Sequence, residues 1–129
     1  MLKVFLVEDE KIMREGIKEN ILWEEEGFLF SGEAQDGELA YPMILDLKPD
    51  IVITDIKMPF MDGLELSKLI KKDLPNVKII ILSGFDEFEY AKEAINIGVT
   101  EYLLKPIDRQ ELIKAIRRVA ELIYEERAK

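Results

Sequence analysis

The chain has 129 residues, 48% of them hydrophobic, which suits one domain with a full core. Its formal net charge of −9 argues against direct binding to nucleic acid, because the phosphates would repel an acidic surface. The absence of cysteine excludes disulfides and thiolate metal sites, and the absence of histidine removes the commonest general base.

Strand and helix patterns alternate along the first part of the chain. A β-branched apolar run predicts a strand over Leu2–Val7, and apolar residues at helical spacing then predict a helix. The stripe of this helix consists of Ile12, Met13, Ile17 and Ile21. A second strand is expected over Phe28–Ala34, followed by a helix that Asp36-Gly37 opens and that runs to about Leu47. Pro42 lies inside this helix and predicts a kink or a later start.

The same alternation continues to the end of the chain. Strands are expected over Ile51–Thr54, Val77–Leu82 and Thr100–Leu104, each followed by a helix. The apolar stripes of these helices are Leu66, Leu69 and Ile70, then Phe88, Ala91 and Ile95, then Leu112, Ile116, Val119, Ala120 and Ile123. Gly98 ends the second of these helices at a typical C′ position, and Asp108 caps the last one.

These alternating elements determine the fold class. Five strand–helix units predict an α/β fold with a doubly wound five-stranded parallel sheet and right-handed crossovers. Nearly continuous apolar strands are typical of a sheet that helices cover on both faces, in three α/β/α layers. No repeat, linker or low-complexity stretch interrupts the pattern, so residues 1–129 are expected to form a single domain.

Polar side chains follow the predicted strands at the points where they end. These residues are Glu8 and Asp9, Asp55, Ser83 and Lys105. Parallel sheets of this class carry their working site outside the carboxyl ends of the strands, so the five side chains should converge. Three carboxylates, a hydroxyl and an ammonium suit the binding of a hard cation and the handling of a phosphoryl group.

Together with the loop Asp55–Gly63, these strand ends resemble the receiver domain of two-component response regulators over essentially the whole chain. The run Ser83–Ile107, with Gly84-Phe85-Asp86-Glu87-Phe88-Glu89-Tyr90-Ala91, is most similar to receivers of the YesN-like, AraC-linked subfamily. The resemblance implies a flavodoxin-like fold with strand order 2-1-3-4-5. It also implies a cis bond between Lys105 and Pro106, which the base rate for X–Pro bonds would not suggest.

The resemblance implies that Asp55 is the phosphoacceptor, whose carboxylate attacks the phosphorus of a phosphohistidine on a sensor histidine kinase. It also implies that Glu8, Asp9, Asp55 and the Lys57 backbone carbonyl hold Mg²⁺, which prefers few carboxylates and keeps several waters. Taken alone, Asp55 would be a turn or capping residue, and Glu8-Asp9-Glu10 a solvated acidic turn. The other strand-end residues in register favour the functional interpretation.

Three further roles follow from the resemblance. Lys105 would neutralise charge on the transferred group, because phosphoryl transfer is catalysed mainly by positioning and charge neutralisation. Ser83 and Tyr102 would form a switch pair, in which the hydroxyl binds a phosphoryl oxygen and the aromatic ring rotates inward. The ordinary alternatives are a lysine that extends to solvent, a serine that starts a loop and a tyrosine that packs. Gly84 departs from the family pattern, where alanine is frequent, but it keeps a small residue.

The implied protein is a phosphoacceptor, not an enzyme beyond assisting its own phosphorylation and dephosphorylation. Phosphorylation would change the surface of the fourth helix, fifth strand and fifth helix, and could thereby form a homodimer. The subfamily implies transcription regulation through an AraC-type DNA-binding output domain that is absent from this chain, and DNA is expected only through that domain. The alternative is a free-standing receiver that acts by protein–protein interaction.

No stretch approaches a membrane span and no signal-peptide pattern precedes Leu2, so a cytoplasmic protein without membrane contact is expected.

Two unrelated functions fit the sequence less well. An aspartate-nucleophile phosphatase of the haloacid-dehalogenase type would carry its nucleophile after the first strand, with a second aspartate two residues later. Here Glu10 and Lys11 follow the first strand and its acidic pair, and Lys57 stands two residues beyond Asp55. A flavodoxin would need a hydroxyl- and glycine-rich phosphate loop after the first strand, where this chain has three acids.

Overall fold

Five parallel strands form one sheet in the order β2-β1-β3-β4-β5, as predicted. The computed structural model describes residues 1–84 and 88–129. The strands are β1 (Leu2–Val7), β2 (Phe28–Ala34), β3 (Ile51–Asp55), β4 (Lys78–Ser83) and β5 (Glu101–Leu104). The helices are α1 (Lys11–Asn20), α2 (Gly37–Leu47), α3 (Gly63–Asp73), α4 (Phe88–Ile97) and α5 (Arg109–Arg127).

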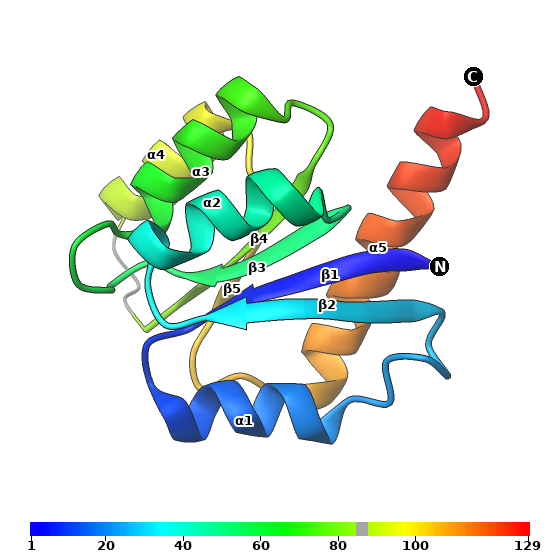
Figure 1. Cartoon of the computed structure of the whole chain (residues 1–129), viewed down its shortest axis with the longest axis horizontal. Coiled ribbons are helices and arrows are strands. Elements are labelled where there is room, and N and C mark those ends of the chain that lie inside the picture. The colour runs from blue at the N-terminus through cyan, green and yellow to red at the C-terminus, as the bar shows by residue number, and fades with distance from the viewer. Residues whose placement is uncertain (85–87) are drawn as a thin grey trace.

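Helices cover both faces of the sheet and give the three expected layers (Figure 1). Helices α1 and α5 lie on one face, and α2, α3 and α4 lie on the other. Strand β1 shows the reason, because successive side chains of a strand point to opposite faces. Val4 and Leu6 enter one core, Phe5 and Val7 enter the other, and all four are fully buried. Among the described residues, no helix has the length and apolar character needed to cross a membrane.

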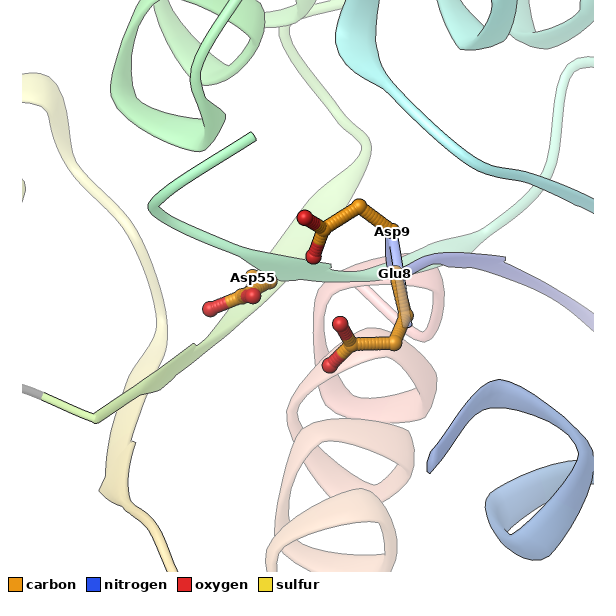
Figure 2. A group of neighbouring side chains, drawn as sticks. All are labelled: Glu8, Asp9 and Asp55. Atoms are coloured by element: carbon orange, nitrogen blue, oxygen red, sulfur yellow. The ribbon is translucent and has the colours of Figure 1, made fainter. Parts of the chain in front are cut away.

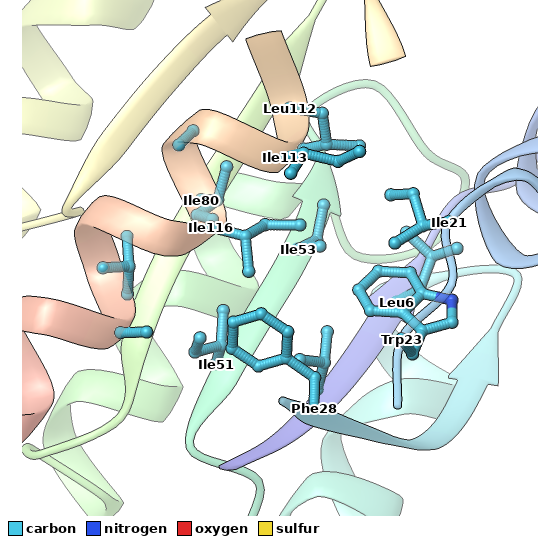
Figure 3. Close-up of a cluster of buried hydrophobic side chains, with 14 of the residues drawn as sticks. Leu6, Ile21, Trp23, Phe28, Ile51, Ile53, Ile80, Leu112, Ile113 and Ile116 are labelled. Carbon is cyan, nitrogen blue, oxygen red and sulfur yellow. The ribbon is translucent and has the colours of Figure 1, made fainter. Parts of the chain in front are cut away.

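Helix α5 closes the core on the side of α1. Its residues Leu112, Ile113 and Ile116 lie beside Ile53 and Ile80 of the central strands (Figure 3). The predicted stripe of this helix is buried throughout. Each such aliphatic side chain contributes roughly 1.5–3 kcal/mol through removal from water, so the long C-terminal helix is a major part of the fold's stability.

The predicted stripe of the fourth helix was wrong, because α4 buries a different face. Phe88 and Ile95 are 76% and 75% exposed, whereas Ala94 is buried and Tyr90 and Ile97 pack against the core. Both sets have helical spacing, so periodicity alone could not choose between them.

A similar error affects α1, whose buried face excludes one member of the predicted stripe. Ile12 is 87% exposed. It lies five residues before Ile17, a rotation of about 140° around the helix axis, so it points away from the face that Ile17 buries.

Helix α2 begins at Gly37 and continues through Pro42 to Leu47, so the predicted later start was wrong. The Asp36 side chain caps the helix by accepting a hydrogen bond from the Leu39 N–H at 2.8 Å. This cap fixes the first turn, and Ala40 and Ile44 are buried on either side of the proline. Tertiary packing therefore outweighs the hydrogen bond that proline removes. The other predicted helix ends are confirmed: Asp108 caps α5, and Gly98 follows α4 with a φ of +93°.

Two strands end one residue later than predicted, and two begin one residue later. Asp55 and Ser83 are the last residues of β3 and β4, and not the first residues after them. Strand β4 begins at Lys78 instead of Val77, and β5 begins at Glu101 instead of Thr100. As members of strands, Asp55 and Ser83 have side chains with a fixed direction relative to the sheet.

Candidate functional site

The sheet register brings the polar strand ends together. Strand β1 pairs with β3, with Val7 opposite Thr54, so Glu8 and Asp9 emerge beside Asp55. Asp55 is itself opposite Leu82 in β4, and Ser83 is opposite Leu104 in β5. The Lys105 N–H then donates to the Ser83 carbonyl at 2.7 Å. The carboxyl edge thus gathers residues from four neighbouring strands, as predicted.

Three carboxylates form the centre of this edge. Glu8, Asp9 and Asp55 each offer an oxygen, and these oxygens lie within 4.8 Å of one another. Figure 2 shows the carboxylates of Glu8 and Asp9 extending from the end of β1 toward Asp55. Glu8 and Asp55 are buried, and Asp9 is exposed. An all-oxygen donor set with one exposed member fits Mg²⁺, which keeps waters and binds substrate oxygens.

Lys105 bridges the two buried acids. Its Nζ lies 3.0 Å from Glu8 Oε1 and 3.1 Å from Asp55 Oδ2. The Lys105–Pro106 bond that precedes α5 is cis, which confirms the expectation from the resemblance. The lysine supplies a positive charge between two carboxylates that would otherwise repel one another.

Backbone groups hold the acids in place. The Ile56 N–H donates to Asp55 Oδ1 at 2.8 Å, which leaves Oδ2 to Lys105. The Glu10 N–H donates to Glu8 Oε2 at 3.1 Å. The Arg14 guanidinium donates to the Glu8 backbone carbonyl at 2.7 Å, so α1 is attached to the same turn. These contacts give each buried carboxylate a defined orientation.

The environment shifts the pKa values of Glu8, Asp55 and Lys105. Burial raises the pKa of Glu8 to about 7, although the hydrogen bond from Lys105 opposes this, and the charge of Asp55 adds to it. Burial also raises the pKa of Asp55, while the charge and hydrogen bond of Lys105 lower it in part. Burial alone would lower the pKa of Lys105, but its hydrogen bond to Glu8 and the charge of Asp55 outweigh burial and raise it. One ammonium does not fully compensate two buried acids, so a divalent cation would favour their ionised forms.

The remaining predicted residues lie around this centre. Ser83 is fully buried at the end of β4. A methyl group on the adjoining Gly84 would lie 3.9 Å from Lys105, so the alanine that is frequent in the family would fit there.

Tyr102 is partly buried on β5 and packs against the core under α4. It also lines a cavity of about 170 Å³ with Ala91, Ala94, Ile95, Val99, Thr100 and Glu101. The Lys57 ammonium lies 5.7 Å from the centre of the Tyr90 ring. Phe85, Asp86 and Glu87, part of the run that carried the subfamily resemblance, lie outside the described residues.

Gly63 has a structural role at the site that the sequence analysis did not assign. A Cβ at this position would lie 1.9 Å from the Asp55 carbonyl oxygen, and the Gly63 N–H donates to the Ile56 carbonyl at 2.8 Å. The first residue of α3 therefore contacts the backbone of Asp55 directly. The pair Asp62-Gly63 was a usable signal, because glycine directly after a helix cap permits such a close approach.

A model of the response regulator receiver domain family matches residues 4–117 of the chain. The chain is 50% identical over 119 residues to the transcriptional regulatory protein YesN of Bacillus subtilis. That alignment covers 92% of this chain and 32% of YesN, so the chain corresponds to one part of a longer relative.

Solved structures agree with the family model. The receiver domain of AraT, a response regulator from Geobacillus stearothermophilus, has a TM-score of 0.91 and 44% identity, with 98% of each chain covered. A two-component transcriptional regulator AraC from Clostridium phytofermentans has a TM-score of 0.86 and 33% identity, covering 99% of this chain and 98% of that one. Both similarities cover nearly the whole of this chain.

Proposed function

The chain belongs to the response regulator receiver domain family, and from this membership we propose that it accepts a phosphoryl group on Asp55 from a sensor histidine kinase. The observation that carries the proposal is the position of Lys105, within 3.1 Å of both Glu8 and Asp55. A solvated strand-end aspartate would need no such buried cation. A phosphoacceptor needs one, because phosphoryl transfer depends on positioning and on neutralised charge.

In the proposed reaction, an Asp55 carboxylate oxygen attacks the phosphorus of the phosphohistidine. The new O–P bond forms as the N–P bond breaks, and the histidine nitrogen keeps the electron pair of the broken bond. The Ile56 N–H holds Oδ1 and Lys105 holds Oδ2, so the carboxylate is oriented before the donor arrives. Mg²⁺ held by Glu8, Asp9, Asp55 and the Lys57 carbonyl would neutralise charge on the phosphoryl oxygens.

The output of this reaction would be a change at the neighbouring strand ends. Ser83 would bond a phosphoryl oxygen and draw its loop inward, and the Tyr102 ring, which lines the cavity beside α4, would rotate further inward. The surface of α4, β5 and α5 would change with them, and a homodimer would form there. Two states of this kind need to differ by only a few kcal/mol in their affinity for the phosphoryl group.

The whole protein is proposed to be a cytoplasmic transcription regulator whose AraC-type output domain contacts DNA. Its support is the coverage of only 32% of YesN, together with the similarity to a two-component transcriptional regulator AraC. The second candidate is a free-standing receiver that acts by protein–protein interaction. The similarity favours it less, because the alignment covers only 32% of YesN and this relative therefore contains more than a receiver domain. In either case the domain is a phosphoacceptor and not an enzyme with a turned-over substrate.

Phosphate labelling tests the proposal directly. Wild type and Asp55→Asn are incubated with radiolabelled acetyl phosphate and Mg²⁺, and the adduct is mapped by mass spectrometry. We expect labelling on Asp55 alone, its loss in Asp55→Asn, and its loss in wild type when EDTA removes the metal. Undiminished labelling of Asp55→Asn would contradict the assignment.

A further inference from the structure

Phe60 occupies a strained backbone conformation in the loop between β3 and α3. Its φ is +70°, and the Met61 N–H donates across it to the Pro59 carbonyl at 2.8 Å. These two features define a γ-turn of the rare form that has a positive φ at its centre. A bulky side chain is seldom found there, because its Cβ crowds the backbone.

The residues that follow Phe60 hold the turn in place. The Gly37 N–H donates to the Met61 carbonyl at 3.3 Å, and a Cβ at Gly37 would lie only 2.7 Å from that oxygen. Asp62 caps α3 by accepting from the Glu65 N–H at 2.8 Å. Strained conformations persist where their surroundings determine them in this way, and they concentrate at functional sites.

Burial does not account for a phenylalanine at this apex. The side chain of Phe60 is 82% exposed, whereas Met58 and Met61 in the same loop pack against the core. Glycine or asparagine would adopt the turn with less strain and would not leave an aromatic ring in water. The turn therefore presents an aromatic side chain to solvent at a cost in stability.

The loop keeps this side chain close to the phosphoacceptor. Gly63 is in contact with the Asp55 carbonyl, and three residues span at most about 11 Å, so Phe60 stays within that distance of Gly63. Asp55 is only 5% exposed, so a protein donor must place its phosphohistidine directly over this edge. An ordinary interface covers about 800 Å² on each partner, a patch with a radius of about 16 Å, so an interface centred on Asp55 is wide enough to include Phe60.

We propose that Phe60 is an anchor residue through which the protein phosphodonor docks over the site, an inference that rests on the proposed function. Rigid aromatic side chains dominate interface energies, and one held outward in advance loses little freedom on binding. The occupant is the histidine-bearing donor and not a second copy of this chain. Only the donor must reach Asp55, and therefore only the donor must cover this loop.

The test compares a protein donor with a small one. The protein donor is the cytoplasmic part of a sensor histidine kinase, autophosphorylated with ATP and chosen from a panel as the fastest donor to wild type. The small donor is acetyl phosphate. For Phe60→Asn and Phe60→Gly we expect kcat/KM from the kinase to fall at least tenfold, with acetyl phosphate labelling within twofold of wild type. Phe60→Tyr, which keeps the ring, should retain the kinase rate.

Controls separate docking from folding and from self-association. Phe60→Asn and Phe60→Gly should melt no lower than wild type, because both residues relieve the turn. Leu22→Asn removes an exposed apolar side chain beyond the far end of α1 and should leave the kinase rate unchanged. An equal loss with acetyl phosphate, an unchanged kinase rate, or an effect on sedimentation alone would overturn the anchor role. A wild-type chain that no donor labels would overturn the proposed function, and this inference with it.

Discussion

At Glu8 the environment opposes ionisation most strongly, because a fully buried carboxylate shares one ammonium with a second acid. The pKa of Glu8 rises from 4.5 to about 7, which means that the folded state retains a proton that the unfolded chain releases. A group of this kind stabilises the fold below its unfolded pKa and loses that contribution as pH rises through its folded pKa. Near neutral pH without metal, Glu8 is thus a source of instability.

Replacement of Glu8 by glutamine should therefore flatten the pH dependence of stability. In EDTA, the free energy of unfolding of wild type should fall relative to that of Glu8→Gln between about pH 4.5 and pH 7. The shift of the pKa from 4.5 to about 7 limits the effect to the order of 3 kcal/mol. Urea denaturation across this range measures it, and parallel curves for the two proteins would contradict the burial argument.

At the level of elements, the contact between α3 and β3 depends on glycine at position 63, which has no side chain. Gly63→Ala would place a methyl group 1.9 Å from the Asp55 carbonyl oxygen, so helix or strand must move. We expect a loss of about 1–3 kcal/mol or more, since overpacked sites with backbone on both sides relax poorly. The displaced Asp55 should also be labelled more slowly by acetyl phosphate.

Gly16→Ala is a matched control in α1. The nearest atom to its new methyl group would be the Asn20 side chain, at 3.8 Å. Alanine is favoured over glycine inside a helix by about 1 kcal/mol, so this variant should be more stable than wild type. Thermal melts of the two variants separate steric contact from glycine content. A stable, fully active Gly63→Ala would show that the contact is not needed.

The same elements show what could be predicted from the sequence. Apolar runs predicted a parallel α/β sheet, and the resemblance to receiver domains supplied its strand order. The convergence of Glu8, Asp9, Asp55 and Lys105 could also be predicted, because the carboxyl ends of parallel strands lie at one edge of the sheet. The buried face of α4 could not be predicted, since two stripes with the same spacing compete and only packing decides. The strained turn at Phe60 was also missed, because no local preference favours phenylalanine there.

At the scale of the whole molecule, ion pairs within the chain reduce the charge that the surface of α4, β5 and α5 can offer to a second copy. Arg118 pairs with Glu101 at 2.8 Å, Arg117 pairs with Glu26 at 2.7 Å, and both arginines belong to α5. Such exposed pairs contribute little individually, but they reduce the charge available to a second copy. The same surface exposes Ile95 of α4 and Leu104 of β5. An interface there would be more apolar than the charges suggest.

We therefore expect activation to produce an association that depends on Ile95. Beryllofluoride, which mimics the phosphoryl group, should raise the sedimentation coefficient of wild type in the presence of Mg²⁺. Ile95→Asn should abolish most of this change, while salt should have a smaller effect because the arginines are already paired. Leu22→Asn serves as the exposed apolar control. A monomer under every condition would contradict dimerisation through this surface.

The ion pair between Lys105 and Glu8 joins residues 97 positions apart, and this separation has a consequence during synthesis. A ribosome that adds about 5–20 residues per second produces Glu8 roughly 5 to 20 s before Lys105. Over that interval Glu8 and Asp55 lack the Lys105 ammonium that bridges them in the folded domain, and α5 has not yet closed its side of the core. The bridged acceptor site is thus among the last features to form, and a chain that ends before Lys105 lacks the cation that joins Glu8 to Asp55.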